Sequence, residues 1–420
     1  MPVGNVAGSL GLQKEKVMSK LEKLTLAGSR LWKHIKLNTK IVPVSNRPTR
    51  IPMQPLTAGK FRVGNFDGAG MGLGSGPQTV PATASCVSFV QASQWTAQAE
   101  YTTDSDEKAI EDYVAVLQSQ QQETMSGYMD ALLQTDGSNT LDTVVSVSGS
   151  VITVNNPNAF QDNQDIDFYS GLLDAGGAFL GSGTILSVDP INTQIVMSTA
   201  IPVGVGAGTR MLVSGSPGVS NSGLFGLRYF NVAGNTGTYL NVQKSAYPGK
   251  FNVASFNAPG SLTPALVRAL EALIELRIGV EKAENSKLTP HCNVDMMAAW
   301  ENLSLTVQRQ DVANMRDTSG DMLPKKRVRT IGGLEAIVNE RARPGYIDWL
   351  PLEHCFSIQS KALSLYDVKG QTVFPAYAAD GSVATSMLMY LVIMIQFVFS
   401  QPVQQAYLSS VSIPAKYFGR

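Results

Sequence analysis

The chain has 420 residues and no net charge, with 33 basic and 33 acidic side chains. Charged residues make up only 16% of it, below the roughly 25% of an ordinary globular domain, whereas apolar residues make up 44%. So few charges argue against a free monomer and favour a chain whose surface is covered by partners.

The length predicts two or three domains. The three cysteines, Cys86, Cys292 and Cys355, are far apart in the sequence. They form no disulfide framework and indicate a reducing compartment. No apolar run follows the charged N-terminal stretch, so no secretion signal is expected.

Charge is unevenly spread along the chain. Residues 1–60 hold eleven Lys or Arg against two Glu, a net charge of +9. Residues 90–200 hold fifteen acidic residues against one Lys, a net charge of −14. This asymmetry suits contacts between copies, in which the basic end of one chain meets the acidic middle of the next.

The first predicted element is a basic amphipathic helix over residues 12–36. Extended chain follows it rather than a partner helix, so its apolar stripe needs another surface to cover it. The stripe consists of Val17, Leu21, Leu24, Leu31 and Ile35.

Residues 41–95 form a long segment with little helical pattern. It contains six prolines and the glycine-rich stretch Gly68–Gly76. A segment of this length is either disordered or a functional arm, and an ordered arm is best explained by contact with another chain. The glycine spacing matches no nucleotide-binding motif and does not stand between a strand and a helix, so we interpret it as a loop.

Residues 104–135 give the strongest helix pattern in the sequence. Asp104 and Glu107 form a capping box at its start. An apolar stripe follows, interrupted by Gln121. At 1.5 Å per residue the helix would be roughly 45 Å long, which suits a spine that lies on a sheet.

Residues 139–217 change character. Short runs rich in Val, Ile and Thr alternate with Gly, Asn, Asp and Pro. This spacing predicts an all-β barrel or sandwich, placed as a self-contained module after the spine helix.

Two further helices and two strands follow. Residues 262–280 predict a helix with Thr263 as N-cap and Pro264 at its first position. Residues 293–307 predict another helix, and strands are expected at 350–366 and 382–400.

The run Gly381–Pro402 resembles a membrane segment, because no charged residue occurs between residues 381 and 415. Its unbroken apolar core, Met387–Ile395, is shorter than the ~20 residues that a spanning helix needs. Every second residue from Met387 to Phe399 is apolar, which favours a buried strand over a buried helix or a membrane helix. We expect this face to pack under the spine helix, and the face with Tyr390 and Gln396 to be partly covered by neighbouring chains.

Candidate chemical sites are weak. The His-Cys pairs at 291–292 and 354–355 are adjacent residues, whose side chains diverge, and lack the spacing of zinc ligands. The acidic run Asp162, Asp165 and Asp167 lacks a calcium-loop pattern and predicts a polar barrel rim. We predict no catalytic, metal or cofactor site and no enzyme.

A basic cluster, KKRVR, occupies residues 325–329. The zero net charge and the absence of interleaved aromatic residues argue against a sequence-specific nucleic-acid reader. A solvated loop or a weak electrostatic contact with nucleic acid remain the two interpretations.

The order of these parts resembles the major capsid proteins of tailed bacteriophages, which have the Hong Kong 97-type fold. Residues 47–76 look like the extended E-loop of that family, and residues 91–118 look like the run into its spine helix. The stretch DGSVATSMLMYLVIMIQFVFSQP (380–402) looks like its closing P-domain strand. The resemblance covers most of the chain through its architecture and loose motifs.

The resemblance implies an α+β chain divided into six parts. They are an N-terminal arm (1–40), an E-loop (41–95), a P-domain spine helix (96–138), an inserted β-barrel-like domain (139–217), an A-domain (218–345), and P-domain strands with a return to the A-domain (346–420). The β module resembles insertion domains that some of these proteins carry.

The resemblance also implies the function. Copies would form the hexamers and pentamers of an icosahedral head around double-stranded DNA, in the virion and, before assembly, in the host cytoplasm. Scaffolding, portal and decoration proteins are possible partners; contact with DNA would be non-specific, and no membrane is involved. The chain has no long scaffold-like N-terminal extension, so a separate scaffolding protein or the short basic helix would take that role.

The charge pattern then nominates inter-subunit contacts. Basic arm residues of one copy would meet the acidic spine of the next. The candidates are Lys14, Lys16, Lys20, Lys23, Arg47, Arg50, Lys60, Arg62, Asp104, Asp106, Glu107, Glu111 and Asp112. Some relatives cross-link an E-loop lysine to a neighbour, and Lys60 is the only lysine between residues 41 and 89.

Two other functions remain as alternatives. The β module alone would suit a surface or tail-associated β-rich adhesion protein, although the long helix and the apolar C-terminal strand argue against it. An enzyme whose site leaves no sequence motif is the third reading.

Overall fold

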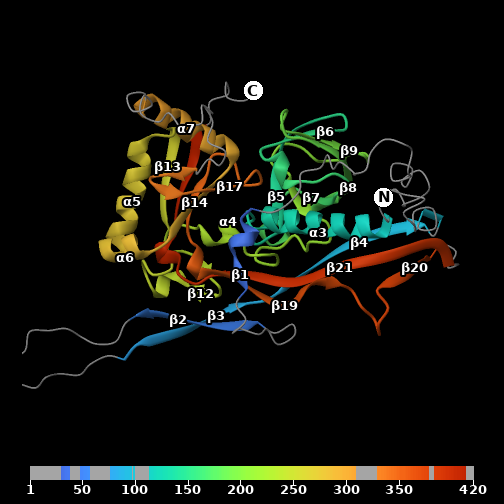
Figure 1. The fold of residues 1–420 in the computed structure, drawn as a ribbon, viewed down its shortest axis with the longest axis horizontal. Coiled ribbons are helices and arrows are strands. Elements are labelled where there is room, and N and C mark those ends of the chain that lie inside the picture. Colours follow the sequence, from blue (N-terminus) through green and yellow to red (C-terminus); the bar gives the residue numbers. More distant parts are fainter. Residues whose placement is uncertain are drawn as a thin grey trace, which may run out of the picture.

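The computed structural model describes residues 30–37, 48–56, 76–96, 98–99, 113–308, 329–377 and 383–412. Within them lie two main sheets, a closed barrel, a long helix beside the barrel and a two-stranded ribbon that extends from the body (Figure 1).

The long strand β21, Val383–Phe399, is the centre of the first sheet. β4 (Val87–Thr96) pairs with one edge of it. β19 (Cys355–Leu365) and β20 (Val373–Tyr377) share its other edge, and the short β1 (Lys36–Leu37) runs parallel to β19. The strand predicted at 382–400 is therefore confirmed. No helix in the described part of the chain is long and apolar enough to cross a membrane.

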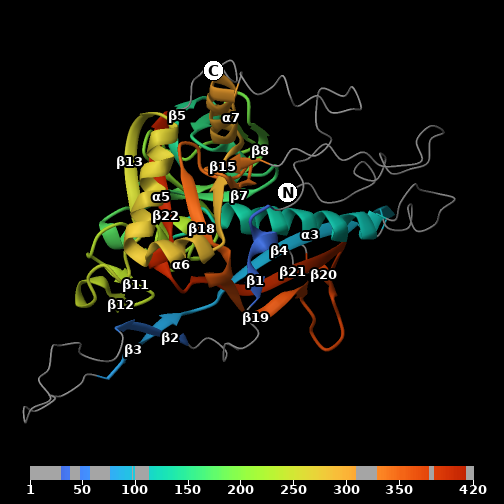
Figure 2. The same cartoon turned by 60° about the vertical axis from the view of Figure 1, so that its left-hand side comes forward.

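The spine helix α3, Tyr113–Leu132, lies along this sheet (Figures 1 and 2). It confirms the predicted helix from residue 113 onward, while the capping box lies outside the described residues. The expected packing of the apolar strand face under the helix is also confirmed. The shared core contains Met125, Met129 and Leu132 of the helix and Leu391, Ile393, Ile395, Phe397 and Phe399 of the strand.

The prediction for Gln396 was wrong. It is only 1% exposed within the single chain, so no neighbouring chain is needed to cover it. Its Oε1 accepts from the Phe225 backbone N–H at 2.8 Å, and its Nε2 donates to the carbonyls of Ser85 and Gly223. The polar break in the apolar run is thus a buried amide that joins three segments, because a buried polar group must be satisfied internally.

The β module forms a closed six-stranded barrel. Its strands pair in the order β10-β5-β6-β9-β8-β7. Their bounds are β5 Thr140–Ser148, β6 Val151–Val154, β7 Asp165–Tyr169, β8 Phe179–Asp189, β9 Gln194–Met197 and β10 Arg210–Val213. The inward-facing side chains make a separate core that includes Ile152, Ile166, Phe168 and Ile185. Of the two predicted architectures, barrel and sandwich, the structure has the barrel.

A second sheet has the order β13-β22-β18-β14-β17. The strands are β13 Ala254–Ser261, β22 Ala406–Ser412, β18 Ile347–Pro351, β14 Leu288–Cys292 and β17 Ile337–Val338. Helices α5 (Pro264–Ile278), α6 (Val280–Asn285) and α7 (Val294–Gln308) accompany it. Both predicted helices are confirmed, and the Thr263 side chain caps α5 by accepting from Leu266 N–H.

Short elements connect these bodies. The helix α4 (Leu227–Phe230) follows the barrel, and a small hairpin of β11 (Thr238–Tyr239) and β12 (Val242–Gln243) comes next. Another hairpin joins β15 (Thr330–Ile331) to β16 (Leu334–Glu335). The predicted strand at 350–366 is divided, because a 3-10 turn at Leu352–His354 separates β18 from β19.

The ribbon consists of β2 (Thr49–Leu56) and β3 (Gln78–Ala84), paired antiparallel. It lies along the lower side of the molecule, below α6, in both views (Figures 1 and 2). The described parts of the segment predicted as one arm over 41–95 therefore belong to two different structures, the ribbon and the first sheet. β4, at its end, pairs over ten residues with β21 and belongs to the sheet.

The helix predicted over 12–36 is wrong at its described end. Trp32–His34 form a single 3-10 turn, and Lys36–Leu37 are extended against β19. Leu31 and Ile35, assigned to the apolar stripe, are buried in the core of the first sheet. Tertiary packing therefore overrides the helical period here. The rest of that helix lies outside the described residues.

Candidate assembly surfaces

The N-terminal segment is fastened to the spine helix by Asp130. This side chain is fully buried, and its carboxylate accepts the backbone N–H groups of Arg30 and of Trp32, the latter at 2.6 Å. Burial raises the pKa of Asp130, while the two amides oppose that shift. The Trp32 ring meets Phe397 edge-on at 5.5 Å between centroids. The chain thus enters the core at a fixed point.

Asp130→Ala should loosen this entry point. Two backbone donors lose a charged acceptor, so we expect the free energy of unfolding to fall by about 2 kcal/mol. Trypsin cleavage after Arg30 and Lys33, located by mass spectrometry, should become at least several-fold faster. Gln122→Ala, at an exposed position of the same helix, is the control and should cleave like the parent. Unchanged cleavage in Asp130→Ala would contradict the anchoring role.

The base of the ribbon is fixed to the body. Thr83 donates its backbone N–H to Leu240 O at 2.9 Å, and Asn241 Nδ2 donates to the Thr83 hydroxyl at 2.6 Å. Alternate residues of β2 are buried, and Ile51 and Met53 belong to the core of the first sheet. The ribbon is therefore rigid at its root.

One of the thirteen predicted contact residues lies in the described chain. Arg50 is exposed on β2, opposite Thr83. The structure therefore places it at the ribbon's root. The other twelve, among them the four N-terminal lysines and the five acidic residues before α3, lie outside the described residues and stay predictions.

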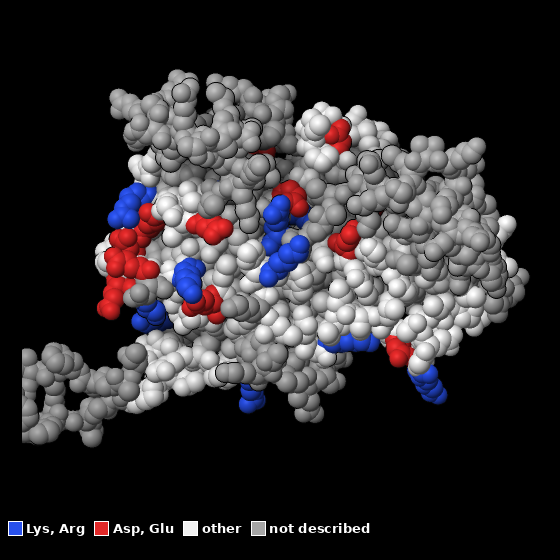
Figure 3. All heavy atoms as spheres, viewed as in Figure 1, with Lys and Arg blue, Asp and Glu red and all other residues white. Residues whose placement is uncertain are grey.

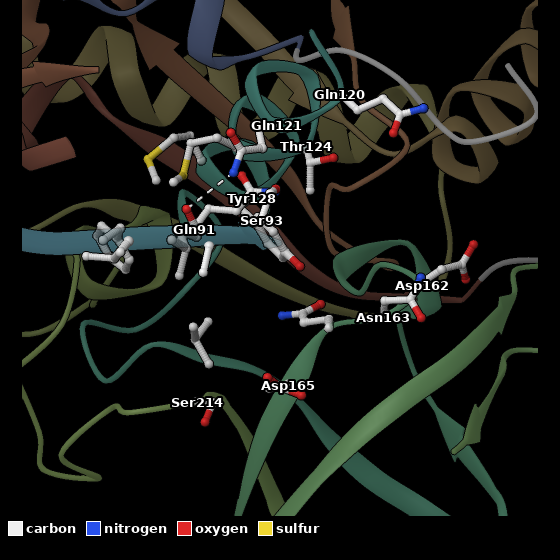
Figure 4. A pocket seen from close by; sticks show the side chains of 18 of the residues that line it. Gln91, Ser93, Gln120, Gln121, Thr124, Tyr128, Asp162, Asn163, Asp165 and Ser214 are labelled. Atoms are coloured by element: carbon white, nitrogen blue, oxygen red, sulfur yellow. Dashed lines mark hydrogen bonds between the residues drawn. The ribbon is translucent and has the colours of Figure 1, made fainter. Parts of the chain in front are cut away.

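A cavity of about 490 Å³ opens between α3, β4 and the barrel (Figure 4). Its walls are apolar where Leu117, Met125 and Met129 of the helix line them, and Asp162 and Asp165 stand at the barrel side. Gln121, which interrupts the helix stripe, donates to Gln91 O of β4 at 3.5 Å. The polar residue in the stripe thus joins helix to strand.

The three aspartates of the acidic run accept hydrogen bonds from residues of the barrel module itself. Asp167 accepts from Ser182, from Ser214 and from the Gly215 backbone N–H. Asp165 accepts from the Thr184 hydroxyl at 2.6 Å, and Asp162 accepts from Val188 N–H at 2.9 Å. Asp162 and Asp165 are exposed, as the predicted polar rim requires, whereas Asp167 is buried and the prediction was wrong for it.

The two His-Cys pairs are separated by the fold. Cys292 belongs to the core of the second sheet, and Cys355 to that of the first. Burial raises the pKa of the Cys292 thiol to about 12 and raises that of Cys355 further still, so both stay protonated. Within the described ranges, no three His, Cys, Asp or Glu side chains gather as a metal site.

A buried ionic cluster was not predicted from the sequence. Asp348, 2% exposed, accepts from Asn231 Nδ2 at 2.6 Å and from Arg228 Nη2 at 3.3 Å. His291 Nδ1 lies 3.8 Å from the same carboxylate. The aspartate interrupts the otherwise apolar strand β18, and this was the one signal that could have marked it.

Charged side chains are sparse on the face seen in Figure 3 and gather mainly over α5 and α6. Arg268 bridges Glu271 at 3.4 Å and Glu275 at 3.3 Å there. From the basic cluster at 325–329 only Arg329 is described, 3.9 Å from Glu301. The described residues on the rest of this face are largely uncharged, as expected for a chain covered by partners.

Comparison with known proteins identifies the fold. No family model matches the sequence, and no curated protein matches it. Among solved structures, the capsid asymmetric unit of cyanophage A-1(L) is similar at a TM-score of 0.54 and 13% identity, over 95% of this chain and 97% of that one. The capsid of an empty GTA particle is similar at 0.50 and 10% identity, over 95% of each chain. The chain therefore has a phage-capsid fold along nearly its whole length.

Proposed function

We propose that the chain is the major capsid protein of a tailed bacteriophage, whose copies assemble into the hexamers and pentamers of an icosahedral head. The observation that carries this proposal is the likeness to a capsid subunit over 95% of this chain and 97% of that one. The low charge of the sequence and the two-stranded ribbon, which joins no larger sheet, support it, since contacts with neighbouring copies would account for both.

The parts take the following roles in this proposal. The first sheet with α3 is the P-domain, the second sheet with its helices is the A-domain, and the ribbon β2–β3 is the E-loop that reaches a neighbouring subunit. The barrel is an inserted domain. Scaffolding, portal and decoration proteins and non-specific contact with double-stranded DNA belong to the proposal as partners.

Electron microscopy of the purified full-length chain tests the proposal. Closed shells or rings of five and six subunits are the expected particles. A monodisperse monomer at high protein concentration, in the presence of crowding agents and across a range of salt, would contradict it.

The proposed role of the barrel is to stabilise the subunit. Its strands close on themselves around their own core, and its contacts with the body include Asn156 Nδ2 donating to Arg341 O at 3.0 Å. Replacing residues 139–217 by a short linker should therefore leave a foldable body with less heat tolerance. We expect the melting temperature of assembled shells to fall by roughly 5–10 °C, as for a loss of a few kcal/mol.

The control for this deletion is a single chain break between residues 191 and 192, in the exposed turn between β8 and β9, which leaves the six barrel strands in place. Shells of the deletion that melt with the parent would refute the stabilising role. Loss of all soluble protein would mean that the stabilising role is larger than proposed, because the body would then depend on the barrel for folding.

A further inference from the structure

A small polar cavity lies where the barrel meets the body. Its volume is about 160 Å³. Its walls come from β5 and β10 of the barrel, the turn after α3, helix α4 and the loop before β18. Three arginines line it, Arg210, Arg228 and Arg343, and we name it the arginine cavity.

The three arginines differ in how their charge is balanced. Arg210 pairs with Asp136 at 3.1 Å, and Arg228 pairs with Asp348 at 3.3 Å. Arg343 is exposed, and its Cζ lies 4.9 Å from the centroid of the Tyr346 ring. The Cζ of Arg228 lies 3.8 Å from the same centroid. No carboxylate of the described chain pairs with Arg343. The guanidinium groups of Arg228 and Arg343 therefore both lie at the Tyr346 ring, and only that of Arg228 is paired with a carboxylate.

The carboxylates that line the cavity are already held. Asp142 accepts from the backbone N–H groups of Asn156 at 2.6 Å and Thr143 at 2.8 Å. Asp136 accepts from Arg210 and from Ser138 N–H. Neither forms an ion pair with Arg343, so among the described residues this guanidinium is the lining cation without a carboxylate partner.

Two unpartnered donors, Gln134 Nε2 and Arg228 Nε, point to a missing acceptor, and the unpartnered Gln134 Oε1 needs a donor such as the P–OH of a protonated phosphate. Gln134 is only 8% exposed, lines the cavity, and has no hydrogen-bond partner at Nε2 or Oε1. Arg228 Nε, on a side chain that is 10% exposed, also lacks an acceptor. A buried donor without a partner is costly, and native structures rarely retain one unless a water or ligand satisfies it.

We propose that the arginine cavity binds one small oxyanion of the phosphate class. Arg343 and Arg228 supply charged donors, whose planar groups suit phosphate oxygens, and the Gln134 amide supplies a neutral one. The volume is below the ~300–1,000 Å³ of pockets for larger ligands, so a nucleotide is excluded. The bound anion would join barrel, spine helix and body, which makes it a structural ligand of the subunit.

Equilibrium dialysis of the full-length chain against radiolabelled inorganic phosphate tests this proposal, with sodium chloride holding the ionic strength constant. We expect saturable binding of one phosphate per chain. Arg343→Gln should weaken it at least tenfold, and Gln134→Leu should weaken it several-fold. Lys361→Gln is the matched control, because Lys361 also lies over a tyrosine ring, 5.5 Å from Tyr366, away from the cavity.

Each outcome decides the matter. One saturable site that Arg343→Gln removes and Lys361→Gln preserves supports the proposal. Absence of saturable binding means that the cavity holds water only and overturns it. Equal weakening by both variants means general attraction to a positive surface and also overturns it. The measurement needs no assembly, so it stands apart from the test of the capsid function.

Discussion

Leu391→Lys is expected to yield no folded subunit. Leu391 is 3% exposed at the middle of β21, where β4 flanks the strand on one edge and β19 on the other. Its replacement removes a buried leucine, which costs about 2–5 kcal/mol, and places an unpaired ammonium in an apolar core, which costs several kcal/mol more. The sum approaches the ~5–15 kcal/mol that holds a whole domain together.

The measurement is the yield of soluble protein together with its far-ultraviolet circular dichroism and thermal transition. Val90→Lys is the matched control, because Val90 lies on the neighbouring strand, opposite Val392, and is 60% exposed. That variant should fold with a stability close to the parent's, since exposed substitutions change it by only ~0.5 kcal/mol. Soluble, assembled shells from Leu391→Lys would show that the strand is not a core element.

Local sequence patterns predicted the elements whose period agrees with their burial. Three local patterns were informative: the alternation around Leu391, the cap at Thr263 and the turn-bounded β runs of 139–217. Each of them reflects interactions between residues that are close together in the sequence. They therefore yielded the long strand, α5 and the barrel.

Patterns failed where a distant polar contact decides the conformation. Asp130 accepts the backbone N–H groups of Arg30 and Trp32, which lie 100 and 98 positions away along the chain. These bonds place Leu31 in the core instead of in a helix. Gln396 was similarly expected to face outward, because nothing near it in the sequence indicates a partner. Its three partners belong to distant segments, at Ser85, Gly223 and Phe225. No spacing within a window of the sequence encodes such partners.

The same limit applies to the candidate site. Charge counts predicted inter-subunit contacts in the basic arm and in the acidic middle of the chain. Of these predicted contact residues, only Arg50, on the ribbon, lies within the described part of the chain. The arginine cavity was not foreseen, because its residues come from separate parts of the chain that only folding brings together.

Reversing the four N-terminal lysines, Lys14, Lys16, Lys20 and Lys23, to Glu is expected to abolish shell formation while leaving the subunit folded. The change lowers the net charge of residues 1–60 from +9 to +1, against a net −14 over residues 90–200. A contact between the basic arm of one copy and the acidic middle of the next would become repulsive at short range. We expect at least a tenfold loss of shells by electron microscopy and sedimentation.

Two controls separate this contact from a general effect of charge. Replacing the same four lysines by Arg keeps the positive charge and should preserve assembly. Reversing acidic residues of the predicted partner, Asp104, Glu107 and Glu111 to Lys, should restore shells in the reversed arm if the two regions meet directly. Raised salt should weaken the parent's assembly in the same direction, because exposed charge pairs are screened beyond ~8–10 Å at physiological ionic strength. Normal shells from the reversed arm would contradict the contact and leave the apolar stripe of that segment as its means of attachment.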